Sequence, residues 1–412
     1  MMRNNTLLLR CYLGLRYLVP LVAPIVTRKR LAKGKEDASR VQEKLGQPTV
    51  ARPNGRLVWL HAVGLGEVLS LRSLIAALQA HDPALQLLVT SSTTGAAAAI
   101  AKQLPANAIH QYLPIDAPQY SKVFLDHWRP DFVIWAEQDI WPGLIHDVAA
   151  RNIAQVLINA RMNATSYAKL RKIAPAIGPS LRRMAVITAQ DDATASHILK
   201  LGFDRDVRVG PNLKAASPPL DCDQQVLESF QSAINGRRVW VAGAAHPADA
   251  EIVIAAHKAL LRDDPAALLI IAPRNPSLQI QSDLAVQYRS EFEHPAPDAQ
   301  VFVVDNLGDM GLVYRLADVA FVGGTMTDIE GHNPWEAAAL GCHVLHGPRT
   351  ANFRADYKSL DDHGAAVLVH SAAEIITALA TLQAASPEVF IADARRAVGD
   401  LAQELLQLEG TS

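Results

Sequence analysis

The stretch between residues 318 and 348, DVAFVGGTMTDIEGHNPWEAAALGCHVLHGP, combines a glycine loop, a capped helix and a carboxylate. A short apolar strand runs into two glycines. We expect Asn333 to cap a helix that has Pro334 as its first residue and Glu336 in its first turn. Such a unit points backbone N–H groups and the positive end of a helix at a ligand. Because Glu336 would repel a phosphate, its carboxylate suits neutral hydroxyls such as those of a ribose. The stretch therefore predicts a nucleotide or nucleotide-sugar site.

A second glycine loop, in the run WLHAVGLGE over residues 59–67, joins an expected strand to an expected helix. Glu67 falls in the first turn of that helix, where a carboxylate interacts favourably with the helix dipole. From the same position it can act as a general base that takes a proton from an attacking hydroxyl. Position alone leaves both interpretations open. The loop lacks the third glycine and the acidic partner of a dinucleotide-binding fingerprint.

Other chemically active side chains directly follow expected strands. Glu137 ends an apolar strand, which gives no structural reason for a carboxylate there. Arg274 stands after Pro273 at a strand end; its fork geometry suits a phosphate, and the alternative is an ordinary surface arginine. His246 can contact a phosphate or cap the following helix. The run Leu-Gly-Asp at 307–309 precedes a helix and can offer backbone groups to a base or a phosphate.

Length and composition restrict the class of protein. The chain has 412 residues, enough for two domains, and 50% of them are hydrophobic, so large cores are available. The formal net charge of −2 argues against nucleic acid as a partner. Cys11, Cys222 and Cys342 have neither metal-ligand spacing nor a disulfide pattern, which fits a reducing compartment. We expect Cys342 to be a small core residue.

Apolar strands and helices alternate along the chain from residue 57, which predicts parallel sheets covered by helices on both faces. The expected strands are 57–62, 86–91, 109–113, 132–137, 154–159 and 186–189 in a first series, and 239–242, 268–272, 301–304, 319–322, 343–346 and 366–369 in a second. A proline-containing loop at 212–222 separates the two series. We therefore predict an α/β chain with two doubly wound domains. Because ligands bind outside the carboxyl ends of such strands, we expect the site in the cleft between the domains.

The N-terminal residues differ from the rest of the chain. Residues 7–26 are apolar but are interrupted by Arg10, Arg16 and two prolines, and a basic stretch follows at 28–35. The arginines argue against a transmembrane helix, which needs about 20 predominantly apolar residues. The apolar run is not followed by a small-residue cleavage site, which argues against a signal peptide. We expect an interfacial anchor whose basic flank meets anionic lipid, and the alternative is an amphipathic helix packed on the protein body.

Together and in this order, the motifs resemble those of the 3-deoxy-D-manno-octulosonic acid (Kdo) transferases of lipopolysaccharide biosynthesis. The resemblance covers nearly the whole chain. No single motif is specific to the family, but the motifs taken together are. It includes the N-terminal anchor and the runs 34–36, 43–46, 61–67, 112–114, 137–142, 159–161, 212–214, 273–274, 321–324, 331–336 and 347–353.

The resemblance implies two Rossmann-like domains that face a cleft in the glycosyltransferase B arrangement. It implies a membrane-association segment over residues 1–35, an acceptor-binding domain over 36–217 and a nucleotide-sugar-binding domain over 218–412. The implied enzyme is a glycosyltransferase that moves Kdo from CMP-Kdo to a lipid A precursor, lipid IVA, in lipopolysaccharide core synthesis. It would act at the cytoplasmic face of the bacterial inner membrane, with no cofactor and no metal ion.

The family's motifs also imply roles for individual residues. The general base of its Ser-Val-Gly-Glu motif falls on Glu67, and Glu137 and His246 are supporting residues. Its CMP-binding motifs fall on Pro273 and Arg274, on Leu307, Gly308 and Asp309, and on Asn333, Pro334, Trp335 and Glu336. The implied reaction is an inverting displacement. The base deprotonates an acceptor hydroxyl, that oxygen attacks the anomeric carbon, and CMP leaves.

Several positions depart from the family's motifs. Gly64, Ala244 and Ala245 replace hydroxyl residues, Asn275 replaces a histidine, and Glu330 replaces a glycine. Each lost hydroxyl removes a donor worth about 1.5–3 kcal/mol where it bonds a charge. Glu330 would oppose an anionic donor. Two alternatives therefore stay open: a divergent glycosyltransferase of the same fold with a different donor or acceptor, and a non-catalytic nucleotide-binding relative.

Overall fold

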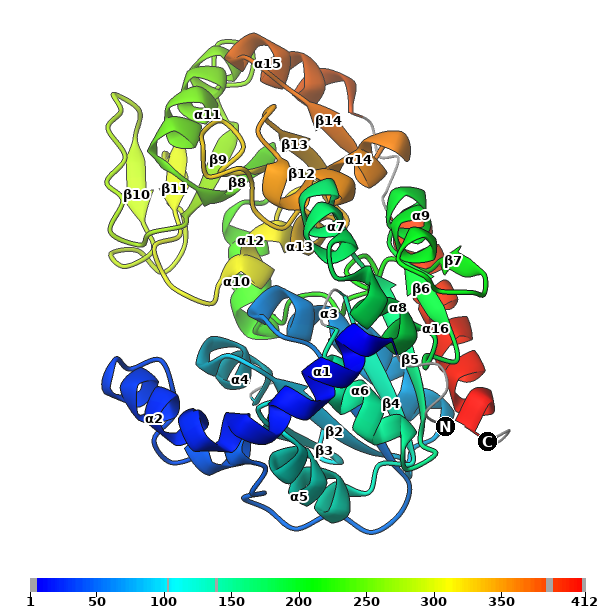
Figure 1. Cartoon of the computed structure of the whole chain (residues 1–412). Coiled ribbons are helices and arrows are strands. Elements are labelled where there is room, and N and C mark those ends of the chain that lie inside the picture. The colour runs from blue at the N-terminus through cyan, green and yellow to red at the C-terminus, as the bar shows by residue number, and fades with distance from the viewer. Residues whose placement is uncertain (1–5, 102–103, 138–139, 383–387, 410–412) are drawn as a thin grey trace. The chain divides into compact units, whose positions relative to one another are not determined.

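The computed structural model describes residues 6–101, 104–137, 140–382 and 388–409, which form two compact units (Figure 1). Unit 1 comprises residues 1–214 and 394–412, and unit 2 comprises residues 215–393. The division after residue 214 falls inside the predicted linker, three residues before the predicted domain boundary at 217. Residues 394–412 differ from the prediction, because they group with unit 1 and not with a domain over 218–412.

Unit 1 is built on a seven-stranded sheet with the order β3-β2-β1-β4-β5-β6-β7, in which neighbouring strands are parallel. The strands are β1 (Leu57–His61), β2 (Gln86–Ser91), β3 (Ala108–Tyr112), β4 (Phe132–Ala136), β5 (Ala154–Ala160), β6 (Ile187–Ala189) and β7 (Val207–Val209). The helices between them are α3 (Leu65–His81), α4 (Thr94–Ala101), α5 (Pro118–Trp128), α6 (Pro142–Ala149), α7 (Ala164–Arg171), α8 (Ala174–Leu181) and α9 (Asp192–Lys200).

Unit 2 repeats this design with the strand order β10-β11-β9-β8-β12-β13-β14, again parallel throughout. The strands are β8 (Val239–Ala245), β9 (Leu268–Pro273), β10 (Val286–Tyr288), β11 (Val301–Val303), β12 (Val319–Val322), β13 (His343–His346) and β14 (Ala366–Leu368). The helices are α10 (Gln224–Ala233), α11 (Pro247–Leu260), α12 (Met310–Arg315), α13 (Trp335–Ala338), η3 (Ala351–Phe353), α14 (Arg354–Asp362) and α15 (Ala372–Thr381). The predicted fold class is confirmed.

Each sheet has its own hydrophobic core, because apolar residues on both faces of a parallel sheet are covered by helices. In unit 1, the ring of Trp59 lies 5.1 Å from that of Trp135 and 4.9 Å from that of Phe124. In unit 2, Phe321 of β12 is fully buried. Cys342 is also buried, as predicted, and burial raises the pKa of its thiol to about 12.

The N-terminal residues form α1 (Leu7–Leu15), η1 (Arg16–Leu18) and α2 (Val19–Ala32), and η2 (Val41–Leu45) follows. Figure 1 shows α1 lying across α6 and α8. Arg16 is buried and pairs at 2.7 Å with both Asp116 and Asp147. Near the end of α2, Arg30 pairs at 2.5 Å with the buried Glu36. Ion pairs therefore hold the helical segment at its middle, through Arg16, and near its C-terminal end, through Arg30.

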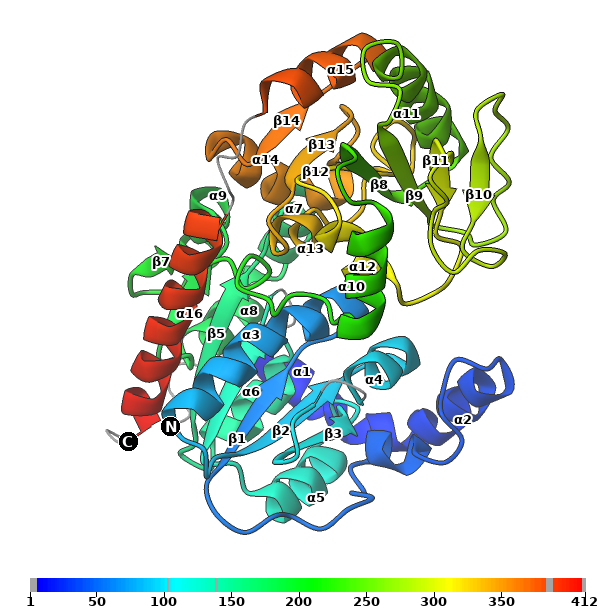
Figure 2. The same cartoon turned by 180° about the vertical axis from the view of Figure 1, so that it is seen from behind.

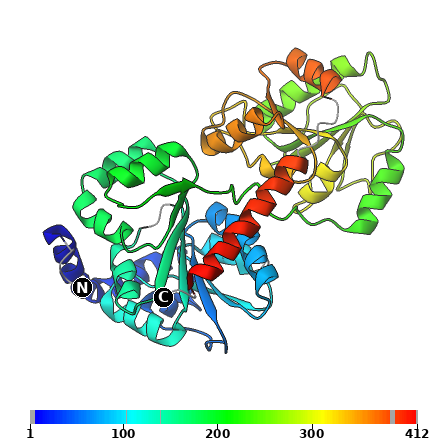
Figure 3. The ribbon, with the colours of Figure 1, turned by 90° about the vertical axis from the view of Figure 1, so that its right-hand side faces the viewer.

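The C-terminal helix is α16 (Glu388–Glu409), and from residue 394 onward it belongs to unit 1 (Figures 2 and 3). Leu401 and Leu405 are buried, and Arg208 pairs with Glu404 at 2.5 Å. These contacts are the physical reason for the difference from the predicted domain boundary: the apolar face of α16 completes the core of unit 1.

Candidate active site

Each sheet contains one switch point, where two neighbouring strands send their connections in opposite directions. It lies between β1 and β4 in unit 1 and between β8 and β12 in unit 2. Ligands of open α/β sheets bind at the carboxyl ends of strands at such points. The predicted residues Glu67 and Glu137 follow β1 and β4, whereas His246 and Asn333 follow β8 and β12. Sequence-predicted residues therefore gather at the switch point of each unit.

In unit 2, a pocket of about 310 Å³ opens at the carboxyl ends of β8, β9 and β12. Six of the nine predicted donor-binding residues line it: Pro273, Arg274, Leu307, Gly308, Asn333 and Glu336. Pro273 ends β9 and Arg274 follows it. Leu307 and Gly308 precede α12, Asn333 precedes α13, and Glu336 lies in α13. Motifs from three separate parts of the chain thus meet around one volume.

The remaining three predicted donor residues do not line this pocket. Trp335 is buried, its indole N–H donates to Asp356 at 2.8 Å, and its ring packs on Phe390. Pro334 is buried beside it. Asp309 faces a neighbouring hollow, where its carboxylate lies 3.8 Å from Arg289. The structure therefore gives Trp335 a packing role and places Asp309 at the pocket's border.

The helix that carries Glu336 is shorter than predicted. α13 begins at Trp335, one residue after the predicted start, and covers a single turn. The N-cap residue is Pro334 and not Asn333 as predicted, although Asn333 Oδ1 still accepts a hydrogen bond from the N–H of Trp335 at 3.2 Å. Burial raises the pKa of Glu336, while a hydrogen bond from Asn333 and the charge of Arg274 oppose that rise. Because one turn provides little macrodipole, Arg274 is the main positive group for an anion here.

Glu330 does not behave as expected from the sequence. Its carboxylate pairs with Arg349 at 2.6 Å and accepts a hydrogen bond from the N–H of Ala351 at 3.3 Å. It is not among the residues that line the pocket. The expectation that Glu330 opposes an anionic donor is therefore not supported, because Arg349 neutralises its charge.

The last residues of β8 pack tightly against the loop after β12. Ala244 has a left-handed backbone with φ of 52°, which costs a non-glycine residue roughly 1–3 kcal/mol and is commonly found at functional sites. A side chain on Gly323 would collide with the backbone of Ala244 and Ala245. Ala244 itself lines the pocket, so one of the lost hydroxyls belongs to the pocket wall.

The pairing of His246 with His332 was missed by sequence reasoning. Their Nε2 atoms lie 2.8 Å apart, and His332 lines the pocket. The sequence singled out His246 as a histidine at a strand end, whereas it included His332 only as a member of the run 331–336. Asn306, Met310 and Phe353 also line the pocket, and their residue types give no signal of this in the sequence.

In unit 1, Glu67 lies in the first turn of α3, as predicted, and its side chain also caps that helix. Its Oε2 accepts hydrogen bonds from the N–H groups of Val63 at 3.0 Å and Gly64 at 3.2 Å, which fixes the start of α3. Glu137 is buried and has a left-handed backbone with φ of 63°. Asn159, at the end of the neighbouring β5, is also left-handed with φ of 51°. Such strained backbone at strand ends marks functional sites more often than other surfaces.

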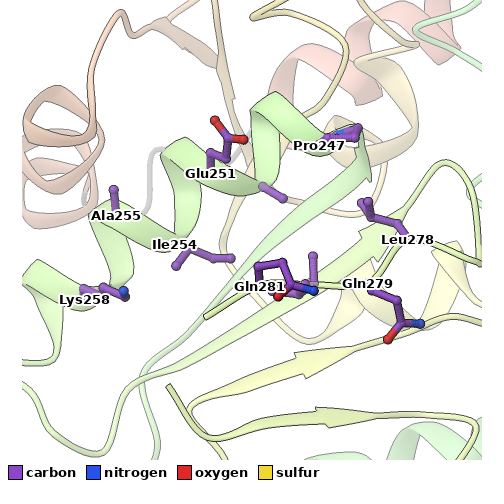
Figure 4. Close-up of a pocket in the computed structure, with 10 residues that line it drawn as sticks. Pro247, Glu251, Ile254, Ala255, Lys258, Leu278, Gln279 and Gln281 are labelled. Carbon is purple, nitrogen blue, oxygen red and sulfur yellow. The ribbon is translucent and has the colours of Figure 1, made fainter. Parts of the chain in front are cut away.

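A second hollow of unit 2, about 350 Å³, lies between α11 and the segment 278–281 (Figure 4). Its lining is mainly apolar and includes Ile254, Leu278 and Ile280, with Glu251 and Lys258 at the helix surface. It lies along α11 and not at the strand ends of the switch point. The pocket at the switch point contains Arg274 and Glu336, which can pair with a phosphate and with hydroxyls, whereas this hollow is mainly apolar.

Within the described residues, His, Cys, Asp and Glu side chains form no group of three or more that can hold a metal ion. Among the described residues, one helical stretch, Leu7–Ala32, is long and apolar enough to cross a membrane. Length and composition alone are weak evidence for a membrane span.

Comparison with known proteins gives the fold a class. The chain superposes on a UDP-GlcNAc 2-epimerase from Neisseria meningitidis bound to UDP-GlcNAc with a TM-score of 0.53, 13% identity, and coverage of 87% of this chain and 100% of that one. It superposes on HepE from Anabaena in complex with UDP-glucose with a TM-score of 0.50, 13% identity, and coverage of 86% and 100%. With two parallel seven-stranded sheets, the chain has a glycosyltransferase B fold.

Sequence comparison gives the family. The family model described as 3-Deoxy-D-manno-octulosonic-acid transferase (kdotransferase) matches residues 39–217. A 3-deoxy-D-manno-octulosonic acid transferase from Rickettsia bellii is 29% identical over 90% of each chain. A probable mitochondrial enzyme of the same description from Arabidopsis thaliana is 30% identical over 85% of this chain and 82% of its own. The protein belongs to the 3-deoxy-D-manno-octulosonic acid transferase family.

Proposed function

We propose that the protein transfers Kdo from CMP-Kdo to the lipid A precursor lipid IVA. The observation that carries this proposal is the meeting of Arg274, Asn333 and Glu336 in one pocket of a chain of this family. The guanidinium fork of Arg274 suits the phosphate of CMP. The Glu336 carboxylate, bonded by Asn333, suits the ribose hydroxyls. Pro273, Leu307 and Gly308 would complete the wall around the nucleotide.

In the proposed reaction, Glu67 is the general base. Its two backbone hydrogen bonds go to Oε2 and hold the carboxylate in one orientation, so that Oε1 can take the proton of an acceptor hydroxyl. The deprotonated oxygen attacks the anomeric carbon of Kdo as the bond from that carbon to the phosphate oxygen breaks. CMP leaves with its additional negative charge stabilised by Arg274. Glu137, buried at the end of β4, supports this side of the reaction.

The test is direct transfer. Purified protein is incubated with CMP-Kdo and lipid IVA, and the lipid product is detected by mass spectrometry. We expect a mass increase of one or more Kdo units on the lipid and release of CMP. Unchanged lipid in the presence of intact CMP-Kdo would overturn the proposal.

A second candidate is a transferase of the same fold with a different donor. Ala244 favours it, because a residue that is a hydroxyl donor in the family's motif lies here on the pocket wall as an alanine. A panel of nucleotide sugars tested by thermal shift separates the two candidates. Stabilisation by CMP-Kdo alone excludes the second, and stabilisation by another nucleotide sugar alone establishes it. No response to any nucleotide would favour a non-catalytic relative.

We also propose that the N-terminal helices lie in the surface of a membrane without crossing it. Their outward side chains are apolar and exposed, namely Leu7, Leu8, Leu15, Tyr17, Leu18, Leu21, Val22, Ile25 and Val26. Basic residues follow at Arg28, Lys29, Lys33 and Lys35. To cross a bilayer, the stretch would have to break the buried ion pairs of Arg16 with Asp116 and Asp147. Such a helix binds anionic membrane surfaces through its apolar face and basic flank.

Vesicle sedimentation tests this arrangement. We expect binding to vesicles that contain phosphatidylglycerol, weaker binding to phosphatidylcholine alone, and loss of binding in Leu21→Glu. Val123→Glu, which changes an exposed apolar residue of α5, is the matched control and should bind normally. A tag placed before residue 7 should stay accessible to protease on the side where the protein was added. Protection of that tag would show a membrane span instead.

A further inference from the structure

His246 and His332 form a direct imidazole pair at the switch point of unit 2. Their Nε2 atoms are 2.8 Å apart, and the ring planes differ by 4°. His246 begins α11 directly after β8, and His332 lies in the loop after β12, the strand that pairs with β8. The pair therefore joins the two loops that meet where a ligand of such a sheet binds.

A contact between two imidazole nitrogens fixes the number of protons between them. One Nε2 must carry a hydrogen and the other must offer a lone pair. Two fully protonated rings would bring two N–H groups together and break the contact. The pair thus holds together with a total charge of zero or plus one.

Charged groups of both signs surround the histidine pair. Asp249 of α11 is fully buried, and its Oδ2 accepts hydrogen bonds from the backbone N–H of His246 at 2.9 Å and of Gly324 at 2.7 Å. Within the described residues, its Oδ1 has no hydrogen-bond partner. The carboxylate therefore fixes both loops and leaves a negative charge beneath the pair.

The groups on the pocket side have mixed charge. Arg274 follows β9 and lines the pocket with His332, as does Glu336 of α13. The Tyr357 hydroxyl of α14 donates to the backbone carbonyl of His332 at 2.9 Å and fixes that residue. Burial lowers the pKa of His332, His246 and Arg274 lower it further, and Asp249 opposes them. These surroundings together favour the neutral form of His332.

We propose that the pair takes up one proton when an anionic oxygen group of the donor, a phosphate or a sugar carboxylate, enters the pocket. The inference rests on the proposed function and adds a residue role to it. The cationic His332 donates its Nε2–H to His246, which leaves its Nδ1–H for the anion. His332 is the anion-binding residue, and His246 is the positioning residue that holds its proton. Arg274 and His332 then share the charge of the departing phosphate.

Calorimetry in buffers of different ionisation enthalpy measures the proton directly. CMP is titrated into the protein at pH 7.5 in three such buffers, and the slope of binding enthalpy against ionisation enthalpy gives the protons taken up. We expect uptake of up to one proton by the unmodified protein and less in His332→Gln and His246→Gln. Protonation of CMP itself is the same in all three proteins and cancels in the difference. His294→Gln, an exposed histidine of unit 2, should match the unmodified protein.

Affinity and ligand choice sharpen the result. Both variants should weaken CMP binding by about tenfold at pH 6.5 and by less at pH 8.5, where the pair stays neutral. Cytidine should bind without proton uptake. Free Kdo separates the two anion sources, because uptake with Kdo but not with CMP would assign the carboxylate instead of the phosphate.

Three outcomes contradict the inference. Equal proton uptake by the unmodified protein and both variants shows that the pair does not titrate on binding. If the variants fail to fold, nitrogen NMR of histidine-labelled unmodified protein reports its protonation with and without CMP, and unchanged signals of the pair refute the inference. Absence of any CMP binding by the unmodified protein contradicts the donor assignment as well, which distinguishes the two failures.

Discussion

The two switch points share a topology and both carry a pair of glycines, but the glycines pack differently. At the unit 1 loop, added side chains on Gly64 and Gly66 would meet no atom within 4 Å. At the unit 2 loop, a side chain on Gly323 would collide with the backbone at the end of β8, and one on Gly324 would lie 2.9 Å from Ile329. The loop after β12 thus builds a closed pocket wall in unit 2, whereas the loop after β1 in unit 1 is open. Under the proposed function, the closed wall suits a small nucleotide and the open loop suits a bulky lipid acceptor.

The largest effect is expected at the open loop. Glu67→Gln keeps the shape of the side chain but removes the base, so we expect transfer to fall by about 10²–10⁴-fold, with CMP affinity unchanged. Glu374 is the matched control, because its Oε2 likewise accepts a backbone N–H, from His370 at 2.9 Å, at the start of α15.

Both variants should lose a similar amount of stability, about 0.5–2 kcal/mol, in thermal unfolding. Glu374→Gln should keep full transfer. If Glu67→Gln also keeps full transfer, Glu67 is a capping residue only and the open loop has no catalytic role.

The next effect is expected in the closed pocket. Arg274→Ala removes a charge-assisted hydrogen bond worth about 1.5–3 kcal/mol, so CMP should bind roughly 10–100-fold more weakly by calorimetry. Arg262→Ala removes an exposed arginine of the same unit and should leave CMP binding unchanged. Unaltered affinity in Arg274→Ala would mean that the pocket does not hold the phosphate.

The glycines themselves test the comparison through stability. Gly323→Ala forces apart the two loops that form the pocket wall and should cost about 1–3 kcal/mol. Gly66→Ala lies in α3 with open space around it and should change stability by less than about 1 kcal/mol, in the stabilising direction. Chemical unfolding of both variants checks this. Equal losses in the two variants would show that the loops do not differ in packing.

The smallest predicted effect is a loss of stability at low pH, which we expect in both units. Burial lowers the pKa of His110 in unit 1 to about 3 and that of His257 in unit 2 to about 4. Because the unfolded chain then takes up each proton near pH 6.5, stability is lost as the pH falls below that value. From pH 7 to 5.5 the loss is roughly 1.3 kcal/mol for each histidine.

Hydrogen exchange resolves this loss by unit. Peptides from β2 and β3 should report His110, and peptides from β8 and β9 should report His257. His257 accepts from the Trp240 indole at 3.1 Å and contacts the Gln300 carbonyl at 2.8 Å, so His257→Gln should reduce the pH dependence of unit 2 only. An equal reduction in unit 1 would contradict the assignment.

Much of the fold was predictable because buried parallel strands are continuous apolar runs. β2, β12 and β13 have the predicted bounds, and most other strands differ by one or two residues at their ends. The strands β7 and β10 were missed because they are short, partly exposed and lack such a run. In the site, Arg274 and Glu336 were recognisable from residue type and position.

The contacts between distant loops were not predictable. Nothing in the sequence near Glu330 indicates that Arg349 neutralises it, and nothing near His246 indicates His332. Trp335 shows a second limit, because a residue inside a binding motif can face the core while its neighbours face the ligand. The direction of a side chain on a one-turn helix depends on the surface against which the helix packs. A sequence motif does not encode that surface.

The division of the chain has a consequence for synthesis. Unit 1 needs the buried face of α16, including Leu401 and Leu405, yet the ribosome makes α16 only after all of unit 2. Although N-terminal domains generally fold first during translation, unit 1 must wait with part of its core uncovered until α16 emerges. Meanwhile the apolar N-terminal helices are already outside the ribosome. Under the proposed membrane arrangement, the nascent chain can therefore reach a membrane surface before its first domain is complete.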